Sequence, residues 1–268
     1  MKLNSAYIVL KRVHKLKLYL LTGSALTFLL FSTQSLAFRV LFIGNSFTRL
    51  SIPTLQGMKS VSPLGVDVFE YEFVDGSSLS DHVNRKETID AINNGAWDYV
   101  VLQDHSRQTL DNHLSFDIAV RSLVSVIRKS GAEPILFATW ARLEQSGYAP
   151  RQLSVIAAYR LIGRELNVSV ADVGGVWLAM YNTNRSVFKR MFDEDGIHQT
   201  KLGAQAVGAS LYKVMYDTDL SWAPGSQSIK SAALALNITR SEHLNSLTNR
   251  RIPPQMAALQ AILSLLNE

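Results

Sequence analysis

The stretch that decides the fold is Arg39-Val-Leu-Phe-Ile-Gly-Asn-Ser-Phe-Thr-Arg-Leu50, a short apolar run that breaks at Gly44-Asn45-Ser46 without a polar linker. Apolar runs of about 4–8 residues bounded by Gly or Asn are typical of strands buried on both faces, and the residues beyond Ser46 can be read as a helix. A serine hydroxyl would then be exposed where the strand turns into the helix. The alternative interpretation is that Asn45 and Ser46 only cap that helix.

Residues 1–37 differ in composition from the rest of the chain. An almost uncharged apolar block, 18–31, ends in Ser35-Leu36-Ala37, and the basic residues before it are Lys2, Lys11, Arg12, Lys15 and Lys17, with no acidic residue. This pattern predicts a secretory signal peptide cleaved after Ala37, and hence a periplasmic or secreted protein. The alternative is an uncleaved membrane anchor, but the run 18–30 is short for a hydrocarbon layer of about 30 Å. We therefore expect no membrane span after cleavage.

Removal of this leader changes the meaning of the net charge. The whole chain has 27 basic and 22 acidic residues, and five of the basic ones lie in the leader, which leaves 22 of each in the mature part. No basic stripe with interleaved aromatic residues remains there, so the sequence argues against a nucleic-acid partner. The absence of cysteine excludes disulfides, thiolate metal sites and a cysteine nucleophile.

Strand and helix patterns alternate along residues 38–216. This alternation predicts right-handed crossovers and a three-layer α/β/α sandwich around a five-stranded parallel sheet. The second strand alternates apolar and polar residues, so we place it near a sheet edge. The expected strands are Arg39–Ile43, Val66–Val74, Trp97–Leu102, Pro134–Ala138 and Val168–Val173, and the expected helices are Ile52–Val61 (capped by Ser51), His82–Asn93, Phe116–Lys129, Leu153–Leu166 and Thr200–Met215.

The composition changes again after Asp217. A linker-like stretch, 220–226, is followed by helical patterns that include the apolar segment Met256–Leu266. We interpret 217–268 as a C-terminal helical extension, either packed on the domain or used to dock a partner. The sequence gives no indication of the oligomeric state.

Two groups of residues carry the predicted chemistry. Ser46, Gly76 and Gln103 each follow a strand, and ligands of parallel sheets bind beyond the carboxyl ends of the strands, so these residues should face one crevice. Near the end of the sheet region, Asp195-Gly-Ile-His198 places a carboxylate three residues before an imidazole. A carboxylate that orients a histidine, which in turn accepts a proton from serine, is what a serine nucleophile requires.

Several alternatives stay open at these positions. Asp193 or Glu194 could orient His198 in place of Asp195. A metal cluster of Asp193, Asp195 and His198 is the weaker interpretation because it contains a single histidine, and we expect neither a metal nor a cofactor.

Together these motifs resemble those of the SGNH (GDSL-like) hydrolases. Gly44-Asn45-Ser46 is similar to that family's first block, and Asp195-Gly-Ile-His198 with the following Leu202-Gly203 is similar to its last block. The resemblance implies a flavodoxin-like fold, with Ser46 as nucleophile, His198 as base and then acid, and Asp195 as its orienting partner. It also implies an oxyanion hole built from the backbone N–H groups of Ser46 and Gly76.

The third block departs from the family pattern of Gly-x-Asn-Asp. This chain has Leu102-Gln103-Asp104-His105-Ser106 instead, which indicates a divergent branch. The side-chain amide of Gln103 could replace the missing asparagine as the third oxyanion donor, or Gln103 could be an ordinary loop residue. His105 is a rival base without a suitably placed carboxylate.

Other residues near the predicted strand ends have two interpretations each. Trp140 and Arg142 follow the fourth strand and could line the substrate site, but packing or solvent exposure explains them equally well. Asp75 and Asp104 can be explained as turn residues.

The predicted function is an exported serine esterase that hydrolyses an oxygen ester, with a short acyl group on a carbohydrate or small molecule as the leading substrate. That substrate class follows from the resemblance alone. The rivals are a lipase or thioesterase, and a catalytically silent protein that binds a glycan or serves as an envelope scaffold.

Overall fold

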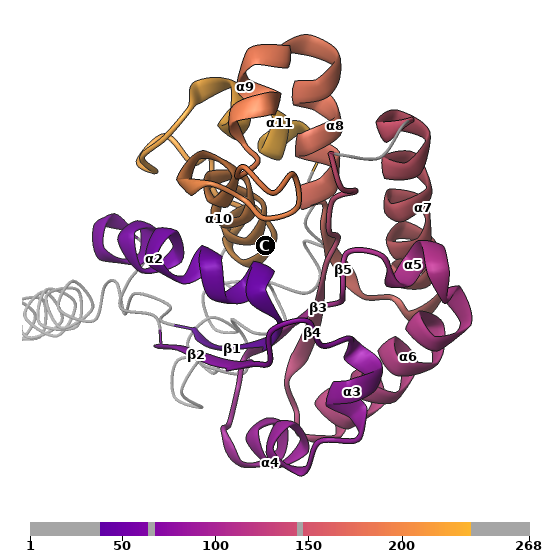
Figure 1. Cartoon of the computed structure of the whole chain (residues 1–268). Helices are drawn as coiled ribbons and strands as arrows, with labels where there is room; N and C mark the ends of the chain where they lie inside the picture. The colour runs from indigo at the N-terminus through magenta and orange to yellow at the C-terminus, as the bar shows by residue number, and fades with distance from the viewer. Residues whose placement is uncertain (1–37, 64–67, 144–146, 237–268) are drawn as a thin grey trace, which may run out of the picture. The chain divides into compact units, whose positions relative to one another are not determined.

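The protein contains a central five-stranded parallel sheet with the strand order β2-β1-β3-β4-β5. The computed structural model describes residues 38–63, 68–143 and 147–236. Helices cover both faces of the sheet (Figure 1), so the predicted α/β/α sandwich is confirmed. The strands are β1 (Arg39–Gly44), β2 (Val68–Phe73), β3 (Tyr99–Gln103), β4 (Glu133–Phe137) and β5 (Ser169–Ala171).

The helices form two layers that enclose two hydrophobic cores. The first layer contains α2 (Ser46–Val61), α8 (Val173–Thr183), α9 (Arg185–Arg190), α10 (Lys201–Tyr216) and α11 (Gln227–Leu236). The second layer contains α3 (Leu79–Val83), α4 (Lys86–Asn94), α5 (Gln108–Asp111), α6 (His113–Lys129) and α7 (Tyr148–Leu166).

Strand β1 shows why the opening sequence is apolar at successive positions. Val40 and Phe42 are buried in the core beneath the first layer, whereas Leu41 and Ile43 are buried in the core beneath the second. Since alternate residues of a strand point to opposite faces, both sets must be apolar. The prediction of a strand buried on both faces is confirmed. The prediction that the second strand lies at a sheet edge is also confirmed, because β2 ends the strand order.

Four of the predicted helices differ from the structure: α6 and α7 begin earlier than predicted, at His113 and Tyr148, and two others differ in their cap or their continuity. Helix α2 begins at Ser46, because the Asn45 side chain accepts the Phe47 N–H as its N-cap, and the predicted cap Ser51 lies inside the helix. The expected helix His82–Asn93 is divided between α3 and α4, because Arg85 has an extended backbone.

The predicted strand Val168–Val173 is too long at its end, and the helices that follow it were not predicted. Asp172 caps α8 by accepting the Gly175 N–H, so Val173 and the glycine pair Gly174-Gly175 are helical. Close packing requires Gly174, since a Cβ there would collide with the Thr139 carbonyl just after β4.

The described part of the C-terminal region packs against the sheet domain. In α11, Ile229 and Ala233 are fully buried in the same core as α10. The boundary at residue 217 stays a prediction. The leader 1–37 and the apolar segment Met256–Leu266 lie outside the described residues. Within the described ranges no helix is long and apolar enough to cross a membrane.

Candidate active site

A pocket of about 300 Å³ lies beyond the carboxyl ends of the strands. Ser46 enters it from the start of α2, Gly76 from the loop after β2, and His105 from the loop after β3. Arg142 contributes from the segment after β4, and His198 from the loop before α10. Residues that are up to 152 positions apart in the chain therefore meet at one site. This site lies at the carboxyl ends of the strands, as predicted from the sequence.

Ser46, His198 and Asp195 form one continuous chain of hydrogen bonds. Ser46 Oγ lies 2.8 Å from His198 Nε2, and His198 Nδ1 lies 2.5 Å from Asp195 Oδ2. Of the three acidic residues that could orient His198, Asp195 occupies that position. Asp193 uses its Oδ1 to accept the Glu194 N–H.

Hydrogen bonds within the loop hold the segment that carries His198. Asp195 Oδ1 accepts the N–H groups of Ile197 at 2.8 Å and His198 at 2.9 Å. Burial alone would raise the pKa of the Asp195 carboxyl, but the hydrogen bonds from the His198 side chain and from these two N–H groups outweigh burial and lower it. The carboxylate is therefore ionised at neutral pH, as its partnership with the imidazole requires.

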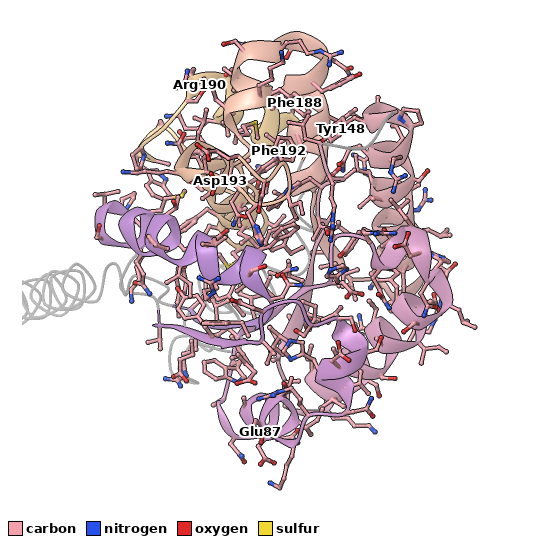
Figure 2. All side chains as sticks on the ribbon, viewed as in Figure 1. Glu87, Tyr148, Phe188, Arg190, Phe192 and Asp193 are labelled. Atoms are coloured by element: carbon pink, nitrogen blue, oxygen red, sulfur yellow. The ribbon has the colours of Figure 1, made fainter. Side chains whose placement is uncertain are left out.

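An aromatic cluster anchors the start of this loop. Figure 2 shows Phe192, directly before Asp193, beside Phe188 and Tyr148. The ring centroids lie 5.4 Å apart for Phe188 and Phe192, and 4.8 Å apart for Tyr148 and Phe188. The loop thus leaves a well-packed core directly before the segment that carries Asp195 and His198.

Trp140 ties the end of β4 to the same loop. Its ring is stacked between Phe47 and Trp177, with centroids 4.3 Å and 4.1 Å away, and its Nε1 donates to the Ile197 carbonyl at 2.9 Å. Phe47 meets the His198 ring edge to face at 5.6 Å. Trp140 is fully buried, so it packs beneath the site and does not form a wall of the pocket.

Two backbone N–H groups at the pocket could bind an oxyanion. Ser46 is the first residue of α2, where a helix has no internal acceptor for its N–H and its dipole favours negative charge. Gly76 lines the same pocket with a φ of +77°, a conformation that favours glycine. Among the described residues, neither N–H has a hydrogen-bond acceptor, as expected for groups that await a ligand.

Gln103 does not occupy the position of a third oxyanion donor, in contrast to the expectation from the sequence. Its side chain is fully buried, and Oε1 accepts the backbone N–H groups of Asn45 at 3.0 Å and Thr48 at 3.1 Å. These two donors fix the orientation of the amide. Nε2 then donates to Asn45 Oδ1 and to the Asp104 carbonyl. Gln103 instead supports the turn that carries Ser46.

A second buried network, which the sequence did not reveal, supports the loop of Gly76. Asn45 Nδ2 donates to the Ser77 carbonyl at 2.8 Å. His82 is fully buried, with Nε2 2.8 Å from the Gly44 carbonyl and 3.1 Å from Ser77 Oγ. Burial lowers the pKa of His82, so its ring is neutral. The sequence predicts that His82 lies in a helix, but it does not reveal these contacts.

His105 lines the pocket without a carboxylate partner among the described residues. Its backbone N–H and that of Leu79 donate to the same oxygen of Asp104, at 2.6 Å and 2.9 Å. Asp104 is fully buried, and this burial raises the pKa of its carboxyl to about 7. Asp104 therefore joins the loops after β2 and β3 and does not orient His105 as a base.

Two arginines complete the charged surface of the pocket. Arg49 Nε donates to Asp75 Oδ1 at 2.9 Å and Oδ2 at 3.0 Å, so Asp75 is an ion-pair partner as well as a turn residue. Arg142 Nε donates to Ser106 Oγ at 3.3 Å. In the part of the chain that the structure describes, no three acidic or histidine side chains gather as a metal site would require.

Comparison with known proteins identifies the fold. No protein-family model and no curated protein matches the chain. A solved structure from Slackia heliotrinireducens, described as a candidate SGNH hydrolase, is similar at 23% identity and a TM-score of 0.58, over 67% of this chain and 99% of the other. Axe2, an acetylxylan esterase from Geobacillus stearothermophilus, is similar at 15% identity and a TM-score of 0.54, over 67% and 95%. TesA is similar at 12% identity and a TM-score of 0.52, over 67% and 98%. The chain therefore has the fold of the SGNH hydrolases, as its sequence motifs predict.

Proposed function

We propose that this protein is a serine esterase that hydrolyses an oxygen ester through an acyl-enzyme on Ser46. The observation that carries the proposal is the unbroken hydrogen-bond chain from Ser46 Oγ through His198 to Asp195, at 2.8 Å and 2.5 Å, inside the pocket. Serine is a weak nucleophile at neutral pH unless a base accepts its proton, and this arrangement supplies the base.

In the first half of the reaction, His198 Nε2 accepts the proton of Ser46 Oγ as the oxygen attacks the ester carbonyl. The negative charge that develops on the carbonyl oxygen is stabilised by the N–H groups of Ser46 and Gly76. His198 then donates the proton to the alcohol, which leaves. In the second half, water repeats the sequence on the acyl-enzyme and releases the acid.

The substrate that fits this proposal carries a short acyl group. A pocket of about 300 Å³ lies at the small end of ligand pockets, which span about 300–1,000 Å³. The similarity to an acetylxylan esterase supports an acetylated carbohydrate as the first substrate to test. We further infer from the composition of residues 1–37 that the mature chain, starting at residue 38, is exported to the periplasm or secreted.

The test is hydrolysis of aryl esters of increasing acyl length by purified residues 38–268. We expect acetate esters to be the best substrates, and Ser46→Ala and His198→Ala each to lower kcat by at least about 10³-fold. Glu194→Gln, in the same loop, is the matched control and should retain activity. If wild type and Ser46→Ala are equally inactive on every ester and on acetylated xylan, the protein is a binding module with this fold.

A further inference from the structure

Of the two arginines among the described residues that line the pocket, one has no carboxylate partner. Arg49 and Asp75 form an ion pair with two hydrogen bonds and together contribute no net charge. His198 is hydrogen-bonded to Asp195. The remaining cation is Arg142, which forms no ion pair within the described residues.

The guanidinium of Arg142 is held in place by one hydrogen bond, and its other N–H groups, unpartnered among the described residues, remain free to bind a ligand. Its Nε donates to Ser106 Oγ at 3.3 Å, and Ser106 is itself buried. No partner for the two terminal nitrogens occurs among residues 38–63, 68–143 and 147–236. The neighbouring His105 adds no second charge, because burial and the nearby Arg142 lower its pKa.

The strand order places Arg142 on one side of the nucleophile. Ser46 follows β1, Gly76 follows β2 on one side, and Arg142 follows β4 on the other side, beyond β3. Adjacent strands lie about 4.8 Å apart, and an arginine that is hydrogen-bonded to Ser106, in the loop after β3, stays on that side of Ser46. The guanidinium therefore faces a part of the ester that lies away from the predicted oxyanion donor Gly76.

We propose that Arg142 is a specificity residue that binds a carboxylate carried by the substrate close to the scissile ester. Two terminal N–H donors of a fixed guanidinium match the two oxygens of a carboxylate. The carboxylate belongs either to the acyl group, as in the half-ester of a dicarboxylic acid, or to the alcohol, as in an acylated uronic acid. This inference rests on the proposed esterase function and narrows its substrate class to anionic esters.

The experiment compares charged and neutral esters of the same shape. For the acyl side the pair is 4-nitrophenyl hemisuccinate and its methyl ester, and for the alcohol side it is 4-acetoxybenzoate and its methyl ester. We expect wild type to have a kcat/KM about ten- to a hundredfold higher for the charged member of one pair. Arg142→Gln should abolish this ratio, whereas Lys129→Gln, which removes the same charge from the exposed end of α6, should preserve it. The pair that shows the preference identifies the source of the carboxylate.

Two results would overturn the inference. One is a wild-type ratio near one in both pairs, and the other is a loss in Arg142→Gln of the same factor for charged and neutral esters, which would make Arg142 a general stabiliser of the transition state. Calorimetric binding of both charged esters to Ser46→Ala, with and without Arg142→Gln, provides a readout without turnover. Loss of binding on removal of Arg142 supports the inference even if wild type hydrolyses no ester, and equal binding contradicts it.

Discussion

Replacement of Gln103 by methionine separates its two possible roles. The side chain keeps its length but loses the amide that accepts the N–H groups of Asn45 and Thr48, both of which are buried. A buried donor left without a partner costs about 1–3 kcal/mol. The two N–H groups alone, without the Thr48 hydroxyl that donates to the same oxygen, should therefore lower the free energy of unfolding by about 2–6 kcal/mol. The cost arises in folding because the amide lies under the turn and outside the pocket lining.

Urea denaturation followed by the fluorescence of the four tryptophans measures this free energy directly. Gln56→Met is the matched control, because Gln56 is half-buried in α2 and its side chain donates one bond, to the Tyr71 hydroxyl. We expect the control to change the free energy of unfolding by less than about 1 kcal/mol. The reasoning is refuted if Gln103→Met is as stable as the control but its kcat falls by about 10²–10³, the loss expected for a missing oxyanion donor.

Three further predictions concern residues in and around the proposed triad of Ser46, His198 and Asp195. Asp195→Asn should lower kcat by about 10³–10⁴ in ester hydrolysis, while Asp193→Asn in the same loop serves as the active control. Trp140→Phe retains an aromatic ring but loses the bond to the Ile197 carbonyl, so kcat should fall by about ten- to a hundredfold with KM nearly unchanged. An equal kcat would contradict that positioning role. Asp104→Asn tests pH dependence: the folded protein keeps a proton on Asp104 up to about pH 7, which the unfolded chain releases near pH 4. Wild type should therefore lose stability relative to Asp104→Asn as pH rises from about 4 to 7, by on the order of 4 kcal/mol in urea denaturation. A pH-independent difference would show that Asp104 is ionised in the fold.

The parts of the site that depend on local spacing could be predicted from the sequence. Asp195 and His198 are three residues apart in one loop, and the loop's own hydrogen bonds bring them together. The position of Ser46 follows from the apolar run before it, since a buried strand must end where the turn residues begin. Parallel strands end on one side of the sheet, so the meeting of Ser46 with Gly76 follows from topology. His198 follows α9 and no strand, and its place beside Ser46 was predicted from the family resemblance.

The direction of the Gln103 side chain could not be predicted in this way. It depends on the backbone of Asn45, 58 residues away, which only the pairing of β1 with β3 brings within reach. The start of α8 was missed for a similar reason. Gly174 lets this helix approach the Thr139 carbonyl just after β4, and the sequence around Gly174 does not show this contact between distant segments.

The most direct test of the central claim is the intact mass of residues 38–268 after treatment with a fluorophosphonate, followed by peptide mapping. The account predicts one adduct, on Ser46, that forms at least about 10³-fold more slowly in His198→Ala because the base is missing. No adduct on Ser46, or equal labelling of Ser46 with and without His198, would contradict the account.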